Sequence, residues 1–450
     1  MKTDLNPMIV ELENLKNEFS KTTDKLIKNI YRQDKIMLRS DKRQQYEYDH
    51  LQDRLAEVEK LELAQEELMD SFIVLIAGAI DAKSKYTGGH CERVPELAMM
   101  LAQAATDCNE GIFANFELKT DDQIRELKIA SWLHDCGKVT TPEYVVDKAT
   151  KLETIYNRIH EIRTRFEVIY RDFQIKALER KLQGENAADV ESWLNIELQK
   201  LQDDFQVIAK ANLGAEFMQK EDQEKIKIIA QREWIRHFDC SIGLAFEERQ
   251  RVKKDNAQTP SVEYLLSDKQ SHIQQREHFD YEDYEARGFK IPVPEHLYNF
   301  GEIYNLTQSR GTLTPEERFK INEHITMTIK MLETLPFPSN LKNVPIYAGM
   351  HHETLIGTGY PRKLTIDDMP IPARIMAIAD IFEALTAPDR PYKEPKTLSD
   401  SIKILNSMVE KQHIDGDIFR LFLSSGIYKK YSDKFLKPEQ NDEVDVTKYI

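Results

Sequence analysis

The stretch that most constrains the fold of this chain is residues 351–361, which read His-His-Glu-Thr-Leu-Ile-Gly-Thr-Gly-Tyr-Pro. Two adjacent histidines offer imidazole nitrogens, and the glycines let backbone and a ligand approach closely. Adjacent side chains on a helix point about 100° apart, and a catalytic metal normally needs three or more protein ligands. The fold must therefore bring further ligands to this stretch from distant parts of the chain.

Four other motifs offer imidazole or carboxylate groups. His90 follows two glycines in Thr-Gly-Gly-His-Cys-Glu-Arg-Val, and His134 and Asp135 are adjacent in Leu-His-Asp-Cys-Gly-Lys. His324 lies in a stretch with helical patterning, and Asp380 is flanked by apolar residues, where a carboxylate is costly to bury unless it meets a cation. Because a carboxylate can bridge two ions, a His-Asp pair can serve one metal or two.

The composition excludes several classes of protein. The chain has 450 residues, enough for two or three domains, and a net charge of −15 from 62 basic and 77 acidic residues. This balance argues against long DNA or RNA as a ligand, because proteins that neutralise phosphates usually carry the opposite charge. Four cysteines without a C-x-x-C pair argue against a zinc ribbon or a disulfide framework and indicate a reducing compartment.

The sequence shows no targeting or membrane signal. The longest apolar run, residues 72–80, is roughly half of what a bilayer crossing needs, and it predicts a buried helix. The N-terminus lacks the apolar region of a signal peptide. We therefore expect a cytoplasmic protein without a membrane span.

Hydrophobic spacing predicts an all-α protein that begins with a helix over residues 1–70. Apolar residues recur there at the alternating intervals of three and four that are typical of a coiled coil, on both sides of a polar segment at 38–50. These residues are Leu12, Leu15, Phe19, Leu51, Leu55 and Val58. The pattern is satisfied either by a lone helix packed on its own domain or by a signalling helix that forms a homodimer, and we favour the homodimer.

The rest of the chain divides into three parts by its pattern. Residues 71–152 and 312–450 have helical spacing and contain all of the motifs, although the tail at 437–450 is expected to fray. Residues 153–311 instead contain two heptad stretches around a polar turn at 184–189. Such a pattern predicts an antiparallel helical hairpin inserted into the domain.

Together, these motifs resemble the HD-GYP subgroup of the HD-domain phosphohydrolases. The resemblance covers residues 71–152 and 312–425, with five motifs in the order of that family, and it extends past Asp380 to Asp-Arg-Pro-Tyr-Lys at 389–393. It implies a helical HD-domain bundle that hydrolyses cyclic di-GMP to linear pGpG, and sometimes to GMP, with two divalent ions that are commonly iron or manganese. Carried over residue by residue, it implies metal ligands at His90, His134, Asp135, His324, His351, His352 and Asp380.

The chemistry of these residues agrees with the resemblance. Imidazole and carboxylate donors without a thiolate suit iron(II), manganese or zinc rather than a structural zinc site. Seven donors exceed the requirement of one ion and suit two ions about 3.5–4 Å apart. The resemblance implies that Asp135 bridges them. A hydroxide between the ions would attack phosphorus in line, and we expect Asp135 and Lys138 to be the catalytic residues.

Cationic and aromatic groups are available for a cyclic dinucleotide. Lys138 follows the His-Asp pair on the same side of a continuing helix or turn and can reach a phosphate oxygen. Arg390 and Lys393 are expected to hold the second phosphate, and Tyr360 to line the pocket. The link at 386–389 is one residue longer than the usual form of the family, which leaves the register of Arg390 and Lys393 open.

The single histidine expected on the helix before the 351–361 stretch has two candidates. We favour His324, because the helix that begins at Leu-Thr-Pro-Glu-Glu (313–317) continues without interruption toward that stretch. The rival, His160, lies beside a heptad position, which is typical of a solvated coiled-coil residue.

Two departures from the family bear on the site. Some members bind a third ion with a glutamate four residues before the first histidine; Tyr86 stands there in this chain, so we expect two ions. The 153–311 insertion has no counterpart in the resemblance, and it can cover the pocket, dock a partner or gate access.

Two other functions fit the same sequence. A metal centre does not read bases, so the substrate can be another cyclic dinucleotide, such as cyclic GMP-AMP, or a different nucleotide phosphoester. Alternatively, the chain is a non-catalytic adaptor that binds diguanylate cyclases. No recognisable sensory domain precedes residue 71, so the sequence does not reveal the input signal. Two alternatives stay open: the signal arrives through a partner helix, or the chain is a fragment of a longer receptor.

Overall fold

The computed structural model of the chain describes residues 7–83, 89–252, 258–387 and 395–450. Within these ranges the chain forms sixteen α-helices and four strands of three or four residues, which confirms the predicted all-α class. None of the described helices combines the length and the apolar character that a membrane crossing requires.

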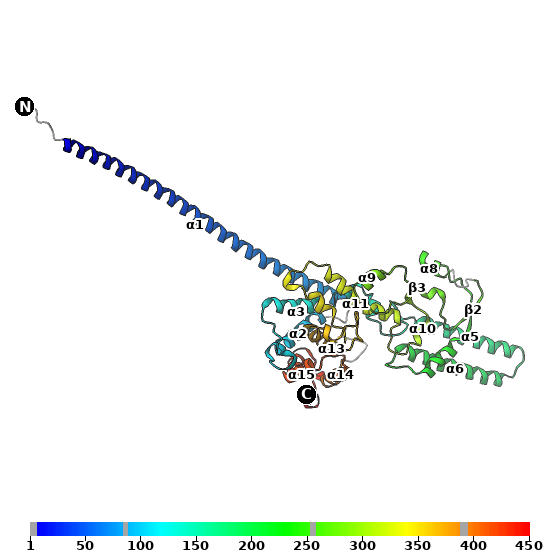
Figure 1. Cartoon of the computed structure of the whole chain (residues 1–450). Helices are drawn as coiled ribbons and strands as arrows, with labels where there is room; N and C mark the ends of the chain where they lie inside the picture. The colour runs from blue at the N-terminus through cyan, green and yellow to red at the C-terminus, as the bar shows by residue number, and fades with distance from the viewer. Residues whose placement is uncertain (1–6, 84–88, 253–257, 388–394) are drawn as a thin grey trace, which may run out of the picture. The chain divides into compact units, whose positions relative to one another are not determined.

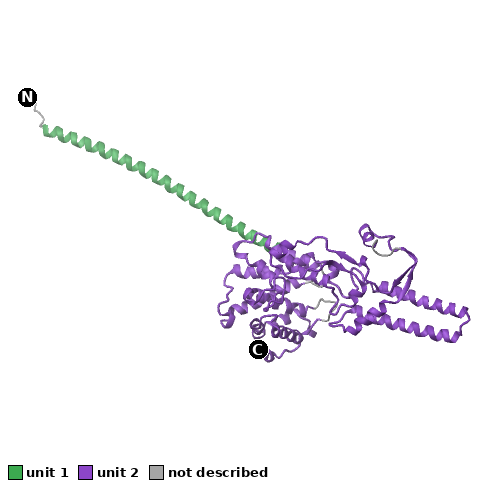
Figure 2. Cartoon of the chain, turned by 45° about the vertical axis from the view of Figure 1, so that its right-hand side comes forward, with its two compact units in different colours: residues 1–72 green, residues 73–450 purple. Residues whose placement is uncertain are grey.

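The chain divides into two units, residues 1–72 and 73–450 (Figure 2). Helix α1 (Pro7–Lys83) runs without a break from the first unit into the second, so the boundary expected at residue 70 lies inside one helix. In residues 7–72 no side chain is buried, and the apolar residues with coiled-coil spacing are exposed.

The larger unit contains a helical bundle around α13 (Ile371–Thr386), which is apolar on most of its surface and is therefore buried. Helix α2 (His90–Asp107) packs against α13 and α3 (Asp121–Leu133). Helix α11 (Pro315–Glu333) packs against α12 (Val344–Gly349) and the short 3-10 helix η2 (Cys136–Thr140). The bundle is completed by α4 (Glu143–Val146), α14 (Leu398–Glu410), α15 (Gly416–Ser424) and α16 (Ile427–Phe435).

Helix α11 begins where its sequence predicts. Thr314 is the N-cap and Pro315 the first helical residue, and the Thr314 side chain accepts a hydrogen bond from the Glu317 N–H. The Glu317 carboxylate in turn accepts the Thr314 N–H at 2.9 Å. Because this reciprocal cap fixes the start of the helix, it also fixes the face on which His324 lies.

The 153–311 insertion contains the predicted hairpin, formed by α5 (Ile159–Leu182) and α6 (Ala187–Leu213) (Figure 1). The turn between them ends at Asn186, whose side-chain oxygen accepts the N–H groups of Ala188 and Asp189. The remaining helices of the insertion are α7 (Lys220–Ala230), α8 (Phe246–Val252), α9 (Tyr281–Ala286) and α10 (Glu302–Leu306).

Two small antiparallel sheets also lie in the insertion. Strand β1 (Glu233–Arg236) pairs with β2 (Ser261–Tyr264), and β3 (Ile273–Gln275) pairs with β4 (His296–Asn299). These strands are not evident from the sequence, because three or four residues are too few to show a strand-like alternation of polar and apolar side chains.

The prediction of a frayed tail at 437–450 is wrong. Two short 3-10 helices form there, and Gln440 is buried. Its side-chain amide donates to the carbonyl oxygens of Thr386 and Lys396 at 2.9 and 3.1 Å. These hydrogen bonds hold the tail to the end of α13, a long-range contact that local composition does not reveal.

Candidate metal centre

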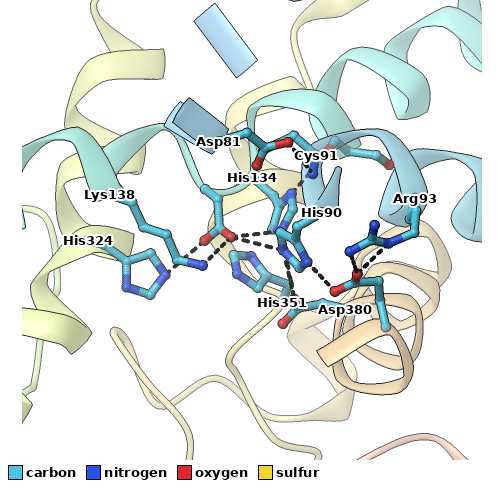
Figure 3. A network of polar contacts seen from close by, with 12 residues as sticks. Asp81, His90, Cys91, Arg93, His134, Lys138, His324, His351 and Asp380 are labelled. Atoms are coloured by element: carbon cyan, nitrogen blue, oxygen red, sulfur yellow. Dashed lines mark hydrogen bonds and ion pairs between the residues drawn. The ribbon is translucent and has the colours of Figure 1, made fainter. Parts of the chain in front are cut away.

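Seven predicted site residues, widely separated in sequence, meet where α2, α3, α11 and α13 converge. Figure 3 labels five of them: His90, His134, His324, His351 and Asp380. His90 is the first residue of α2, and Asp380 lies on α13. The others lie at the end of α3, on α11 or just after α12. Six of the seven are buried and His352 is half-buried; the full set is His90, His134, Asp135, His324, His351, His352 and Asp380.

The seven residues form two groups, in each of which the candidate ligand atoms lie within 4.8 Å of one another. The first group contains His90, His134, Asp135 and Asp380, and the second group contains His324, His351 and His352. Each group offers at least three donors, the number that a protein-bound catalytic ion normally requires. The arrangement suits two ions rather than one.

Asp135 lies between the two groups. Its Oδ2 is 3.2 Å from His90 Nε2 and 3.3 Å from His134 Nε2, both in the first group. Its Oδ1 is 3.3 Å from His324 Nε2, in the second group. One carboxylate thus faces both groups with different oxygens, an arrangement in which a carboxylate can bridge two ions.

Three of the histidines are oriented to bind through Nε2. Nδ1 of His134, His324 and His351 donates to the backbone carbonyl three residues earlier, at 2.7, 2.5 and 2.7 Å. A hydrogen bond of this kind fixes the tautomer of a neutral ring and leaves the lone pair on the other nitrogen.

Two observations indicate that a cation fits the second group. His351 Nε2 is buried and has no hydrogen-bond partner within the described ranges of the chain. His324 Nε2 and His352 Nε2 are 3.2 Å apart, where two lone pairs repel unless a proton or a cation lies between them. Since a buried polar atom without a partner is costly, a metal ion would relieve both defects.

The pKa values differ sharply between the histidines. Burial and the neighbouring His134 lower the pKa of His351 to about 3, so this ring is neutral at physiological pH. Burial also disfavours the charged form of His134, but Asp135 and Asp380 together raise its pKa to about 10. An ion that binds to His134 must therefore displace a proton, which makes metal affinity rise with pH.

Lys138 lies beside the first group. Its Nζ is 2.6 Å from Asp135 Oδ2, and its side chain is 28% exposed. Burial opposes the ammonium form, but Asp135 and Asp380 raise the pKa of Lys138 above its usual value, so the side chain stays charged. A partly exposed cation at this position is placed to bind an anion that enters the centre.

The turn after Asp135 requires a glycine. A Cβ atom on Gly137 would lie 1.9 Å from the carbonyl oxygen of His324, so only glycine lets η2 approach α11 this closely. The Gly137 N–H donates to Thr328 Oγ1 at 2.9 Å, and this hydroxyl donates to the carbonyl of His134 at 3.1 Å. The contact holds the two groups of ligands against each other.

The loop after His352 is held by the third residue of the His-His-Glu motif. The Glu353 carboxylate is buried and accepts the backbone N–H groups of Arg362 and Leu364 at 2.7 and 2.9 Å. Gly359 passes so close that a Cβ atom there would lie 2.5 Å from Glu353 Cα. Glu353 thus shapes the loop and belongs to neither group of ligands.

Tyr360, the predicted pocket residue, lies beside a predicted ligand. Its ring stacks on His352 with the ring centroids 4.8 Å apart. Burial raises the pKa of Tyr360, so its hydroxyl remains neutral. The ring therefore presents a flat, uncharged surface next to the second group.

The insertion contacts this loop. The Lys290 N–H donates to the carbonyl of Pro361 at 2.7 Å, and Arg362 Nε donates to the carbonyl of Arg287 at 2.9 Å. Tyr360 also packs against an apolar cluster formed by Tyr284, Phe289, Ile291, Phe319 and Ile329. The return part of the insertion therefore supports the loop that carries Tyr360.

Glu383, which is not among the residues predicted from the sequence, orients a predicted ligand. The Glu383 carboxylate accepts a hydrogen bond from His90 Nδ1, and its other oxygen lies 2.7 Å from an Arg93 nitrogen. Burial opposes ionisation, but His90 and Arg93 lower the pKa of Glu383 below its usual value. A signal was present, because Glu383 follows Asp380 by three residues and so shares its helix face.

We expect Glu383→Gln to lower the affinity of the first group for its ion by about 10–100-fold, the usual loss when a carboxylate hydrogen-bonded to a ligand histidine is removed. The amide cannot supply the negative charge that orients His90 and increases its basicity. Titration of ion-free protein with Mn²⁺ by calorimetry measures the two affinities, with the exposed Glu224→Gln as the matched control. Unchanged affinity for both ions would contradict this role.

Three further predictions concern the phosphate contacts, the third ion and the choice between His160 and His324; the structure describes the residues of the last one only. Arg390, Lys393 and Tyr86 lie outside the described residues. His160 is exposed, contacts Arg163 at 2.8 Å and lies in neither group, whereas His324 lies in the second. The assignment of the seven residues as metal ligands stays a prediction.

Residues 260–418 match the protein family described as HD domain. The match includes the second group and Asp380. The other residues of the first group lie before it in the sequence and join it only in the folded chain.

Curated relatives are similar over parts of the chain. A cyclic di-GMP phosphodiesterase of Thermotoga maritima is 33% identical over 132 residues, which are 29% of this chain and 34% of the relative. A 3'3'-cGAMP-specific phosphodiesterase 1 of Vibrio cholerae is 33% identical over 141 residues, 29% of this chain and 32% of the relative. A cyclic di-GMP phosphodiesterase of Pseudomonas aeruginosa is 37% identical over 79 residues, 17% and 18% of the two chains. The chain thus matches about a third or less of the length of these relatives.

Proposed function

We propose that this chain is an HD-domain phosphohydrolase of the HD-GYP type, a metal-dependent phosphodiesterase that hydrolyses cyclic di-GMP to pGpG, with GMP as the product of a further cleavage. The observation that supports this proposal most strongly is the meeting of seven imidazole and carboxylate groups in two sets on either side of Asp135. A single structural ion would need neither the second set nor a carboxylate between them.

The side chains have distinct roles in this proposal. The first group would hold one ion and the second group the other, with Asp135 shared between them. Two divalent ions, iron or manganese, would activate water and neutralise charge on the phosphoryl oxygens when bound. Lys138 would bind a phosphate oxygen next to Asp135, since its ammonium is partly exposed there.

The remaining contacts to the substrate are also proposals. Tyr360 would line the pocket through its ring, which lies flat against His352. Arg390 and Lys393 would hold the second phosphate of the dinucleotide, because each phosphate needs a cationic partner.

A second candidate substrate is 3'3'-cGAMP, since several similar proteins are named as phosphodiesterases specific for it. Both candidates share the phosphodiester linkage on which a metal centre acts, and they differ only in one base. The residues of the two groups provide no contact that distinguishes guanine from adenine.

A panel of substrates separates these candidates. We expect protein purified and loaded with Fe²⁺ or Mn²⁺ without oxygen to convert cyclic di-GMP to pGpG, and to lose this activity when the ions are removed. Chromatography of parallel reactions with cyclic di-GMP, 3'3'-cGAMP and cyclic di-AMP measures kcat/KM for each. If kcat/KM is at least about tenfold higher for 3'3'-cGAMP than for cyclic di-GMP, a difference of roughly 1.4 kcal/mol in the activation barrier, then 3'3'-cGAMP is the substrate. If protein with two bound ions turns over none of the three dinucleotides, the proposed activity is contradicted.

We also propose that the chain is a cytoplasmic homodimer joined through α1, with a diguanylate cyclase or a sensor helix as a further partner. Leu12, Leu15 and Phe19 are 61–77% exposed on one helix, which favours a second copy of the same stripe as their partner. All four cysteines are unpaired, as in a reducing compartment.

Replacing Leu12, Leu15 and Phe19 by glutamine is expected to shift the dimer toward monomer, because it removes the part of the apolar seam that precedes the polar segment at 38–50 while keeping the helix. Sedimentation velocity measures the mass of both proteins. A control with Glu11, Lys16 and Lys21 changed to glutamine should remain dimeric. A monomeric unmodified protein would rule out this dimer.

A further inference from the structure

The last turns of α1, residues 73–83, belong to the larger unit and are packed into it. Ile73, Ala77 and Ile80 are buried, with 7%, 0% and 5% of their surface exposed. Their spacing of four and three places them on one face of the helix. This face fixes the helix end in the core, and two charged residues, Asp81 and Lys83, follow directly after it.

Asp81 contacts the backbone on both sides of a predicted ligand. Its Oδ2 accepts the N–H of Gly89 at 3.1 Å and the N–H of Cys91 at 3.3 Å, and His90 stands between them (Figure 3). N–H groups in the first turn of a helix have no partner in that helix. Gly89, the N-cap of α2, has no side chain to supply one. Asp81 therefore caps α2 from another helix.

Lys83 contacts the backbone on the other side of the first group. Its ammonium donates to the carbonyl of Lys138 at 3.2 Å and to the carbonyl of Val139. Both carbonyls belong to η2, which begins directly after Asp135. Two charged side chains two residues apart on α1 thus hold the segment that carries His90 and the segment that carries Lys138.

We propose that Asp81 and Lys83 are positioning residues of the metal centre: Asp81 sets the place of His90, and Lys83 sets the place of Lys138. The inference rests on the proposed metal-dependent function and adds how α1 acts on it. A site that binds a metal tolerates displacements of only about 0.5 Å in its ligands. Because both contacts come from one rigid helix end, a shift or rotation of residues 73–83 displaces both sides of the first group together. The position of residues 73–83 is thereby coupled to the affinity of the first group for its ion and to the affinity of Lys138 for phosphate.

The test measures binding in the full chain. Ion-free protein is titrated with Mn²⁺, and Mn-loaded protein is titrated with inorganic phosphate, both by calorimetry. Asp81→Ala is expected to weaken one of the two Mn²⁺ sites at least about tenfold, while the other site keeps its affinity. Asp81→Asn should recover most of the loss, because an asparagine oxygen can also cap a helix. Lys83→Met should leave both Mn²⁺ sites intact and weaken phosphate binding at least about fivefold, as expected when a charged contact is misplaced.

Glu59→Gln and Lys60→Met, exposed on the same helix, are the matched controls and should change neither affinity. A lower unfolding temperature in Asp81→Ala with both Mn²⁺ affinities unchanged would mean that the cap is only structural, and would overturn the role of Asp81. If Asp81→Ala does not fold, Asp81→Glu takes its place in the test, because the longer side chain must displace the N–H groups of Gly89 and Cys91. Unchanged Mn²⁺ affinities in Asp81→Glu would also overturn the role of Asp81. Unchanged phosphate affinity in Lys83→Met overturns the role of Lys83.

The proposed function and this inference fail in different ways. A protein that binds two Mn²⁺ ions but cleaves no cyclic dinucleotide contradicts the proposed function, and the comparison of Mn²⁺ affinities still decides the role of Asp81. A protein that cleaves cyclic di-GMP with the same Mn²⁺ and phosphate affinities in all variants keeps the proposed function and contradicts the inference.

Discussion

An Asp135→Asn protein is expected to bind neither ion tightly and to lose phosphodiesterase activity by more than about a thousandfold, beyond the loss typical of a single hydrogen-bond donor. The carboxylate faces His90 with one oxygen and His324 with the other, so it serves both groups. An amide has one neutral oxygen and a nitrogen that cannot coordinate, so it cannot bridge. Metal analysis after gel filtration, together with the rate of pGpG formation, measures both effects.

The control for this change is Asp172→Asn, an exposed position on α5. It should keep two ions and full activity. Circular dichroism should show the same helix content in all three proteins, because the apolar residues of the bundle are unaltered. An Asp135→Asn protein that keeps two ions per chain would contradict the two-group arrangement, whatever its activity.

Glu317→Gln is expected to destabilise the larger unit by about 3–5 kcal/mol, the usual cost of removing one partner of a buried ion pair. Lys148 Nζ lies 2.8 and 2.7 Å from the two Glu317 oxygens, and both side chains are almost fully buried. The glutamine can still accept the Thr314 N–H and preserve the start of α11. The loss in the free energy of unfolding therefore reports on the Lys148 ammonium, which is left buried without its ionic partner. Urea unfolding followed by tryptophan fluorescence measures the change.

The double variant Lys148→Met with Glu317→Gln should recover much of this stability, because no buried charge then remains. Glu224→Gln, which breaks an exposed pair with Lys227, should cost less than about 1 kcal/mol. Equal losses in the single and double variants would contradict the explanation.

The Glu317→Gln protein should also gain stability as pH rises. Burial lowers the pKa of Lys148 even when its partner is present, and loss of Glu317 lowers the pKa further. Above the folded-state pKa, the unfolded chain binds more protons than the folded chain, up to the usual pKa of 10.5. The free energy of unfolding therefore rises with pH in that range.

Much of the fold follows from local patterns. Two heptad stretches and a polar turn predicted the α5–α6 hairpin, and Thr314, Pro315 and Glu317 predicted the start of α11. These features depend on residues close in sequence, so intervals and caps are sufficient to find them. The short strands and the buried Gln440 depend on partners far along the chain, and local patterns did not reveal them.

The candidate site shows the same division. Histidine and aspartate motifs identified the residues that meet, because donor chemistry is a property of the side chain itself. Glu383 and Asp81 were missed, because each acts on a residue from another helix: Glu383 on His90, and Asp81 on the N–H groups beside it.

By itself, then, the sequence determined the helical class, the hairpin and the set of available imidazole and carboxylate donors. Only the tertiary structure decided that these donors divide into two groups, that Asp135 stands between them, and that the end of α1 reaches the backbone beside His90 and Lys138. The physical reason is one of scale. Coordination depends on separations of a few ångströms between helices, and the packing of apolar side chains across the whole bundle sets those separations.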